Sequence, residues 1–388
     1  MLVLLAGLMA ACGGSEGNVP GVTDSAIVLG QHTPLSGSMA AVYEPRASAQ
    51  EAYFDDVNSQ GGVCGRRIDL RVEDDFYDPA RALDATKKLV ERDKVLAIIG
   101  GLGTASHSAV YEYLNDKGVP DLFVSSGARK WGSNPERFPY TIGFIIDYTS
   151  EGMIIGKYIS THLSGRKVGV LYQNDDFGRD GLAGLEMSLD PEKNELVSEQ
   201  SYESSDADIR SQVLNLRNDG AEVIVAYSLP GFSAQLINGA SRIGWEPQII
   251  LSYVNTDPVM FEYVSPEAME GVLATGYLTP PNRTDDPAIA RHRQIMADYD
   301  GPEPSNYSLY GQALAETMVK ALGDTCDDLS RESLVRAAES LRGFHPSVLL
   351  QGIDVNLSPS DHYAVQALQM HRAVSGRWEP FGDIVSLD

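Results

Sequence analysis

Hydrophobic positions along the chain form short apolar runs that alternate with longer amphipathic segments. The run at residues 95–99 is rich in β-branched side chains and is followed by glycines, which is typical of a short strand buried on both faces. Residues 78–92 instead repeat their apolar side chains at helical spacing, and Asp78-Pro79 supplies an N-cap and a first-turn proline. The chain therefore alternates strands and helices.

The same patterns divide the chain into two similar halves. Strands are predicted over residues 26–31, 68–73, 95–99, 121–125, 167–172, 198–201, 223–226 and 248–251. Helices are predicted over residues 45–59, 78–92, 105–114, 148–163, 179–189, 209–219, 231–243 and 307–322. Strands separated by helices require right-handed crossovers and hence parallel sheets. We therefore expect an α/β protein with two doubly wound parallel-sheet lobes.

The glycine-rich loop after residues 95–99 is the first candidate for a binding site. It is followed by Thr104, which we expect to cap a helix over residues 105–114. A strand, a glycine loop and a helix N-terminus can present N–H donors to a carboxylate or another acceptor. The alternative is a glycine-rich turn that binds nothing. Ser106 stands where a dinucleotide-binding loop has its third glycine, so no nucleotide is predicted.

The first residues resemble an export signal. Residues 1–11 are apolar and end in small side chains, directly before Cys12. This arrangement resembles the bacterial lipobox, whose cysteine becomes lipid-modified, although no basic residue precedes the run and Met9 replaces the preferred leucine. Residues 13–23 are polar and glycine-rich, as expected of a tether. We favour a lipoprotein over a plain signal peptide.

Composition and the absence of catalytic motifs argue against several classes of function. The 388 residues carry a net charge of −24, which argues against nucleic-acid binding. The sequence has no Gly-x-Ser-x-Gly elbow, no Walker A lysine motif, no His-Glu-x-x-His and no Cys-x-x-Cys. The seven histidines show no metal-ligand spacing, and we expect the pairs Asp74-Asp75 and Asp175-Asp176 to be solvated loop acids. We therefore predict no enzyme, no cofactor and no metal. Cys64 and Cys326 form a possible disulfide pair, which an exported protein permits but the sequence does not establish.

Several motifs in fixed order resemble one family. They are Gly30–Gly37, Asp55–Ile68, Asp74–Pro79, Ile98–Gly101, Asp176–Gly178 and Tyr310–Ala313. Together they resemble the branched-chain amino acid-binding proteins, type I periplasmic solute-binding proteins of bacterial ABC importers. The resemblance implies two lobes that are joined by three crossing strands and close on a solute. It also implies delivery of that solute to an ABC permease by a monomeric protein.

The resemblance further implies how the chain is divided. Residues 1–23 would be the signal and tether, residues 24–141 and 274–352 would form lobe one, and residues 142–273 and 353–388 would form lobe two. The three crossings are then expected near Thr141, Leu273 and Ile353. Cys64 and Cys326 would both belong to lobe one.

By comparison with the motifs of this family, the ligand-binding residues would come from both lobes. They are Tyr43, Gly103, Thr104, Ser125 and Ser126 on lobe one, and Phe177, Ser228 and Tyr253 on lobe two. Hydroxyl and N–H groups of this kind can neutralise a carboxylate without a buried arginine.

The identity of the solute stays open at this point. Amino acid binders of the family usually carry an acidic residue in the loop after the strand at residues 248–251, to meet the ligand ammonium. Here that loop has no acid at the matching place, although Asp257 or Glu44 could substitute. An amide or an aliphatic or aromatic carboxylate is therefore an alternative to a branched-chain amino acid. A ligand-sensing domain of a receptor is the alternative from another class.

Overall fold

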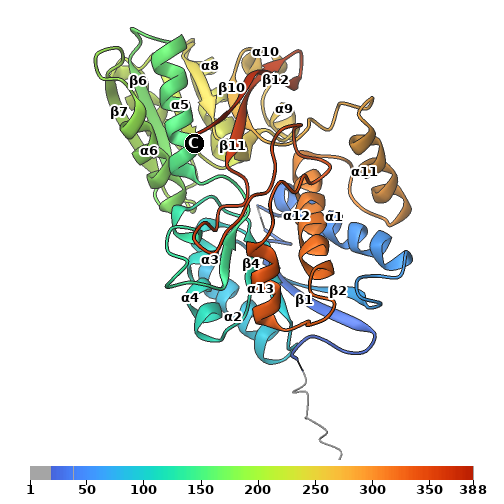
Figure 1. Ribbon diagram of the computed structural model, residues 1–388. Helices are drawn as coiled ribbons and strands as arrows, with labels where there is room; N and C mark the ends of the chain where they lie inside the picture. Colours follow the sequence, from blue (N-terminus) through green and yellow to red (C-terminus); the bar gives the residue numbers. More distant parts are fainter. Residues whose placement is uncertain (1–18, 38, 388) are drawn as a thin grey trace, which may run out of the picture.

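The computed structural model describes residues 19–37 and 39–387, so Cys12 and the predicted signal lie outside the described residues. Two α/β lobes lie one above the other, each built on its own sheet (Figure 1). Lobe one, the lower lobe in that view, contains the first described residues, and the last described strand, β12, lies in lobe two. No helix among the described residues is both long and apolar enough to cross a membrane.

Lobe one is built on a parallel sheet of five strands in the order β2-β1-β3-β4-β5. Its strands are β1 (Ala26–Thr33), β2 (Arg67–Asp74), β3 (Ala97–Ile99), β4 (Asp121–Val124) and β5 (Thr141–Gly143). Its helices are α1 (Ala40–Ser59), α2 (Pro79–Glu91), α3 (Thr104–Ser108), α4 (Tyr111–Asp116), η1 (Arg129–Trp131), α11 (Pro287–Asp298), α12 (Asn306–Gly323) and α13 (Arg331–Glu339). The late helix α12 packs along α1 (Figure 1).

Strand β3 confirms the prediction of a strand buried on both faces. Ile98 packs into the smaller core beneath α2, while Ile99 belongs to the larger core on the opposite face. Both side chains are fully buried. The strand can therefore be apolar throughout, as its sequence indicated.

Lobe two repeats the same topology and adds a hairpin. Its sheet runs β12-β11-β10-β9-β8-β6-β7, so β6 to β10 have the same strand order as β1 to β5. The strands are β6 (Val168–Gln173), β7 (Leu196–Tyr202), β8 (Val223–Tyr227), β9 (Gln248–Leu251), β10 (Leu273–Gly276), β11 (Ala367–Val374) and β12 (Arg377–Ser386). The helices are α5 (Tyr148–His162), α6 (Asp176–Ser188), α7 (Arg210–Asn218), α8 (Pro230–Arg242), η2 (Tyr253–Asn255), α9 (Met260–Tyr263) and α10 (Pro266–Met269).

The hairpin adds to the second sheet antiparallel strands that the sequence analysis did not anticipate. Strand β11 pairs antiparallel with both β10 and β12. Ser375 and Gly376 link β11 to β12 with φ angles of 50° and 78°. A two-residue turn with positive φ at both positions matches the twist of a hairpin, so this Ser-Gly step was a usable signal.

The chain leaves lobe one for the last time later than expected. The third crossing was predicted near Ile353, but the chain is still bonded to lobe one beyond that point, where Gly143 of β5 donates its N–H to His362 O over 3.0 Å. Only at Val365, whose N–H donates to Phe144 O over 2.9 Å, does the chain run beside the first crossing. The turns between residues 353 and 363 pack against lobe one and therefore belong to it.

Two predicted helices begin or end elsewhere. The helix expected over residues 105–114 is divided into α3 and α4, and Gly103 rather than Thr104 is its N-cap residue, with φ at 96°. Helix α1 starts at Ala40 and includes Pro45, so Tyr43 lies on a helix rather than in the preceding loop. Both differences move predicted site residues onto helical turns.

A disulfide joins two distant parts of lobe one. Cys64, in the turn before β2, is bonded to Cys326, just after α12, across a sequence separation of 262 residues. The bond links the N-terminal portion of the lobe to the portion that the chain adds after visiting lobe two.

Candidate binding site between the lobes

A small cavity lies where the two lobes meet. Its volume is about 60 Å³, whereas a single water needs roughly 10–15 Å³, so it has room for a handful of heavy atoms. Lobe one contributes the loops after β3 and β4 and the starts of α1 and α12, while lobe two contributes the loops after β8 and β9 and the starts of α5 and α6. The carboxyl ends of both parallel sheets therefore face the same space, as expected for this architecture.

Aromatic side chains dominate the cavity wall. They are Tyr43, Tyr77, Tyr148, Phe177, Tyr253, Tyr277, Tyr307 and Tyr310. Several are in mutual contact: the Tyr43 ring stands edge-on to Tyr307 with centroids 5.0 Å apart, and Tyr148 stacks on Tyr253 at 5.7 Å. Burial raises the pKa of these phenols, to about 12 for Tyr310. They therefore keep their protons and remain hydrogen-bond donors at neutral pH.

Ser125, at the end of β4, is oriented as a donor toward the cavity. Arg46 Nη1 donates to Ser125 Oγ over 3.0 Å, and the Tyr310 hydroxyl donates to the same oxygen over 3.0 Å. Two donors occupy both lone pairs of a hydroxyl oxygen, so the Ser125 proton is left for another acceptor. Ser125 lines the cavity, and a solute oxygen is the acceptor that the cavity can bring to it.

Arg46 is a fully buried cation directly behind Ser125. It also donates to Gly100 O over 2.7 Å and to Thr33 Oγ1 over 3.1 Å. Burial lowers its pKa to about 10, so the guanidinium is still charged at neutral pH. The sequence reasoning did not anticipate this buried arginine, whose positive field favours an anion near Ser125.

The loop after β3 approaches the cavity with its backbone. Gly103 has a φ of 96°, and a Cβ at this position would lie 2.7 Å from the Tyr77 ring. Both facts require glycine here. Thr104 follows, and its hydroxyl shares a 2.7 Å hydrogen bond with that of Ser126.

The lobe-two wall is held from behind by a buried carboxylate. Glu151 of α5 accepts hydrogen bonds from Ser252 Oγ and from the Tyr253 N–H, both over 2.8 Å, and from the Thr275 hydroxyl. Desolvation raises the pKa of Glu151 to about 7. The Tyr253 hydroxyl donates to Ile146 O over 3.0 Å, so hydrogen bonds hold both the backbone N–H and the side-chain hydroxyl of Tyr253.

An acidic side chain does reach the cavity from the loop after β9. Asp257 is 5% exposed and lines the cavity, and its two oxygens accept from the N–H groups of Val259, over 2.9 Å, and Tyr307, over 3.2 Å. Burial raises the pKa of Asp257. Glu44, the other candidate, does not line the cavity and instead accepts from Ser48.

The lobes are joined by direct hydrogen bonds around the cavity. The Tyr307 hydroxyl of α12 donates to Val254 O of lobe two over 2.7 Å, and Asn306 Nδ2 donates to Thr256 Oγ1 over 3.0 Å. At another edge, Lys130 Nζ lies 2.7 Å from Asp176 Oδ2 at the start of α6. The described arrangement is thus one with the lobes in contact.

Most of the predicted ligand-binding residues meet at this cavity. Tyr43, Gly103, Thr104, Ser125, Phe177 and Tyr253 line it. Two predicted residues do not: Ser126 lies behind Thr104, and the Ser228 hydroxyl faces that of Ser233 over 2.6 Å. The sequence reasoning missed the contributions of Arg46, Tyr77, Asn306, Tyr307 and Tyr310. The motif at Tyr310–Ala313 supported the family resemblance, but the sequence around it did not indicate that the start of α12 reaches the cavity.

Two facing α/β lobes thus enclose a small, largely aromatic cavity between the carboxyl ends of their sheets. A family model described as periplasmic binding protein matches residues 26–377. The chain therefore belongs to the periplasmic binding protein family, which consists of solute-binding proteins.

Curated relatives are distant but cover most of the chain. An "Amino acid binding protein" of Pseudomonas aeruginosa is 26% identical over 334 residues, covering 84% of this chain and 83% of the relative. "Leu/Ile/Val-binding protein homolog 2" of Brucella abortus is 24% identical over 305 residues, covering 78% of this chain and 79% of the relative.

Solved structures share the type I periplasmic binding protein fold. A branched chain amino acid ABC transporter protein from Thermus thermophilus, solved with bound valine, superposes with a TM-score of 0.84 at 20% identity, covering 94% of this chain and 97% of that one. A fatty acid ABC transporter substrate-binding protein from Thermomonospora curvata superposes with a TM-score of 0.81 at 25% identity, covering 95% and 94%.

Proposed function

We propose that this protein is the extracytoplasmic solute-binding component of an ABC importer. It binds a small carboxylate-bearing solute, a branched-chain or related amino acid, between two lobes that close on it. A lipid on Cys12 anchors it to the membrane, where it delivers the solute to an ABC permease as a monomer. The names of its relatives support amino acid transport.

The observation that carries the proposal is the donor state of Ser125. Its oxygen already accepts from Arg46 and Tyr310, which leaves its proton for an acceptor in the cavity, and the buried guanidinium adds positive potential at the same place. A solute carboxylate provides the matching acceptor and charge. The solute would thus place its carboxylate on the lobe-one wall, near Ser125 and Thr104.

A carboxylate and an amide oxygen at the cavity support a solute that also carries an ammonium group. Asp257 is a buried carboxylate at the cavity, and its oxygens accept from the backbone N–H groups of Val259 and Tyr307. Asn306 Oδ1, beside it, is buried and has no hydrogen-bond partner among the described residues. An ammonium group would satisfy both acceptors, which favours an α-amino acid over a simple carboxylate.

A second candidate keeps the same role but changes the solute. The aromatic wall suits an apolar body, and the relative from Thermomonospora curvata is named for fatty acids. An aliphatic or aromatic carboxylate, or an amide, would use Ser125 in the same way without requiring Asp257.

A thermal-shift screen of amino acids, amides, aromatic acids and fatty acids separates these solutes, because a solute that binds only the folded state raises the melting temperature. For the solute found, Ser125→Ala should lose about 1–3 kcal/mol of binding, a factor of roughly 5 to 150 in Kd. Ser228→Ala is the matched control, since Ser228 is also buried but does not line the cavity. Equal losses in both variants would place the solute elsewhere.

A further inference from the structure

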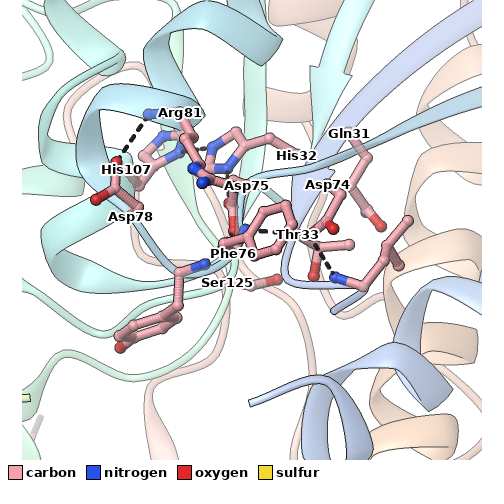
Figure 2. Close-up of polar contacts among 12 residues, drawn as sticks. Gln31, His32, Thr33, Asp74, Asp75, Phe76, Asp78, Arg81, His107 and Ser125 are labelled. Atoms are coloured by element: carbon pink, nitrogen blue, oxygen red, sulfur yellow. Dashed lines mark hydrogen bonds and ion pairs between the residues drawn. The ribbon is translucent and has the colours of Figure 1, made fainter. Parts of the chain in front are cut away.

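Four titratable side chains form a continuous hydrogen-bonded row inside lobe one. Asp75 Oδ2 lies 2.7 Å from His32 Nδ1, His32 Nε2 lies 2.9 Å from His107 Nδ1, and His107 Nε2 lies 2.9 Å from Asp121 Oδ2. Figure 2 shows the first three of these residues converging from β1, the loop after β2 and α3. All four side chains are fully buried, and we call them the Asp-His quartet. Asp75 was expected to be solvated, and that expectation was wrong.

The quartet supports the lobe-one wall of the cavity. The other carboxylate oxygen of Asp75 accepts from the N–H of Tyr77 over 2.8 Å, and Tyr77 lines the cavity. His107 lies on α3, the short helix that begins with Thr104. A Cβ on Gly101 would lie 2.4 Å from His107 Nδ1 and 2.7 Å from His32 Nε2, so the loop after β3 rests directly on the two imidazoles.

The quartet holds one more proton than two neutral imidazoles and two ionised carboxylates supply. Three hydrogen bonds join the four groups, and each bond requires one proton. Two neutral imidazoles provide one proton each, and two carboxylates provide none. A third proton must therefore be present, as an imidazolium or as a carboxylic acid.

The neighbours of the quartet indicate where this proton resides. Burial lowers the pKa of His32, which favours the neutral form with its one proton directed to Asp75. His107 Nδ1 then donates to His32, and the third proton lies between His107 Nε2 and Asp121. The Thr141 hydroxyl donates to Asp121 Oδ2 over 3.0 Å while accepting from Asn115 over 2.7 Å, so Oδ2 is an acceptor and the third proton is assigned to His107. The other oxygen, Asp121 Oδ1, is buried and has no hydrogen-bond partner among the described residues.

We propose that His107 is an imidazolium held by Asp121, and that its extra proton makes the Asp-His quartet the positioning element of the loop that binds the solute. The proposal rests on the proposed function only in assigning this loop to a solute.

Other ionisable groups near the quartet do not hydrogen-bond to it. On α2, Asp78 and Arg81 are exposed to solvent. Across the Trp131 ring, whose edge packs on His107 with centroids 5.0 Å apart, lies Lys130, paired with Asp176 of α6. From α1, the Arg46 guanidinium lies close enough to Asp75 for the two charges to stabilise each other.

Loss of the third proton would leave two acceptors facing each other. At alkaline pH, His107 Nε2 and Asp121 Oδ2 would meet across 2.9 Å without a hydrogen between them, in a site that water does not reach. We expect the loop after β3 to loosen as this happens, and the backbone N–H groups of residues 103–108 to exchange faster.

The first test is ¹⁵N NMR of the histidine rings in the solute-free protein. At neutral pH, where most exposed histidine side chains are neutral, the His107 ring should carry protons on both nitrogens. Asp121→Asn supplies an amide N–H in place of the third proton, so the cationic signal should disappear while the fold is kept. A neutral His107 in the wild type, or a cationic signal that persists in Asp121→Asn, would overturn the proposal. If Asp121→Asn does not fold, the wild-type spectrum decides.

The second test is hydrogen exchange as a function of pH. In the wild type, loss of the third proton should lower the exchange protection of residues 103–108, relative to that of β1, by about 5- to 10-fold. This factor corresponds to the free energy of one hydrogen bond. In Asp121→Asn it should not change with pH. Glu339→Gln is the matched control, because Glu339 lies 3.1 Å from another buried imidazole, His362, away from this loop. A wild type without the alkaline loss contradicts the proposal. Neither test uses a solute, so failure here is distinguishable from failure of the proposed function.

Discussion

The hydroxyl of Tyr307 donates a 2.7 Å hydrogen bond to the carbonyl oxygen of Val254, and these two residues belong to different lobes. The N–H of the same Tyr307 donates to Asp257 of lobe two. One residue at the start of α12 thus makes two bonds that can exist only when the lobes are together. Contact between the lobes in this arrangement therefore involves direct protein–protein hydrogen bonds.

Tyr307→Phe should weaken closure. The substitution keeps the ring against Tyr43 but removes the bond to Val254, which contributes about 0.5–1.5 kcal/mol. Small-angle scattering with the bound solute should show less contraction, and Kd should rise by roughly 2- to 12-fold. Tyr113→Phe is a suitable control because its exposed hydroxyl bonds only Glu91 of the same lobe. Unchanged contraction in Tyr307→Phe would show that the Val254 contact does not hold the lobes.

Thr104→Val should weaken solute binding more than Ser126→Ala. Thr104 lines the cavity, whereas Ser126 supports it from behind through their shared 2.7 Å bond. Replacing the Thr104 hydroxyl leaves an acceptor on the solute unmatched, at a cost of about 1–3 kcal/mol. Calorimetric titration of both variants tests the ranking. A larger loss in Ser126→Ala would contradict the placement of the solute.

Glu151→Gln should reduce the dependence of stability on pH. Burial raises the pKa of Glu151 from an ordinary value of 4.5 to about 7 in the folded protein. The folded state therefore binds more protons than the unfolded state between these values, and stability falls as pH rises from about 4.5 to about 7. Glu151 contributes on the order of 3 kcal/mol to the free energy of unfolding through this shift. The contribution is fully present below about pH 4.5, the ordinary pKa, and is lost as the pH rises through about 7.

Melting temperatures of the wild type and Glu151→Gln across this pH range provide the measurement. Glutamine keeps an acceptor for Tyr253 and a donor for Ser252, so the variant should fold and its curve should be the flatter one. Parallel curves for the two proteins would mean that Glu151 titrates normally.

Replacing both Cys64 and Cys326 with serine should destabilise the protein by about 2–5 kcal/mol. The crosslink spans 262 residues, so it restricts the unfolded chain strongly in the chain-entropy model. Denaturant unfolding of the oxidised, reduced and double-serine proteins gives the comparison. Labelling of both thiols in unreduced, denatured protein would show that the bond is not formed.

Cys12→Ala should release the protein from the membrane. The prediction rests on Ala10-Ala11-Cys12, which resembles a lipobox. Fractionation of cells that express the full precursor should find the wild type with membranes and the variant in the soluble envelope fraction. A wild type that is entirely soluble would leave a plain signal peptide as the better interpretation.

The sequence by itself determined the alternation of strands and helices, the repetition of that pattern in two lobes, and the loops at which a site would form. These features follow from short-range periodicity and from the rule that parallel strands present their carboxyl ends to one edge. Gly103, Thr104 and Ser125 could therefore be placed at a cavity from their positions after β3 and β4.

Only the tertiary structure decided which buried polar groups meet. Arg46 and Ser125 are separated by 79 residues, and His32 and His107 by 75, so no local pattern relates them. A buried charge is tolerable only where the fold supplies its partners, and those partners come from other elements. For the same reason Asp75 and Asp257 resembled solvated loop acids in the sequence, whereas packing of the two lobes and of lobe one's interior removes both carboxylates from water.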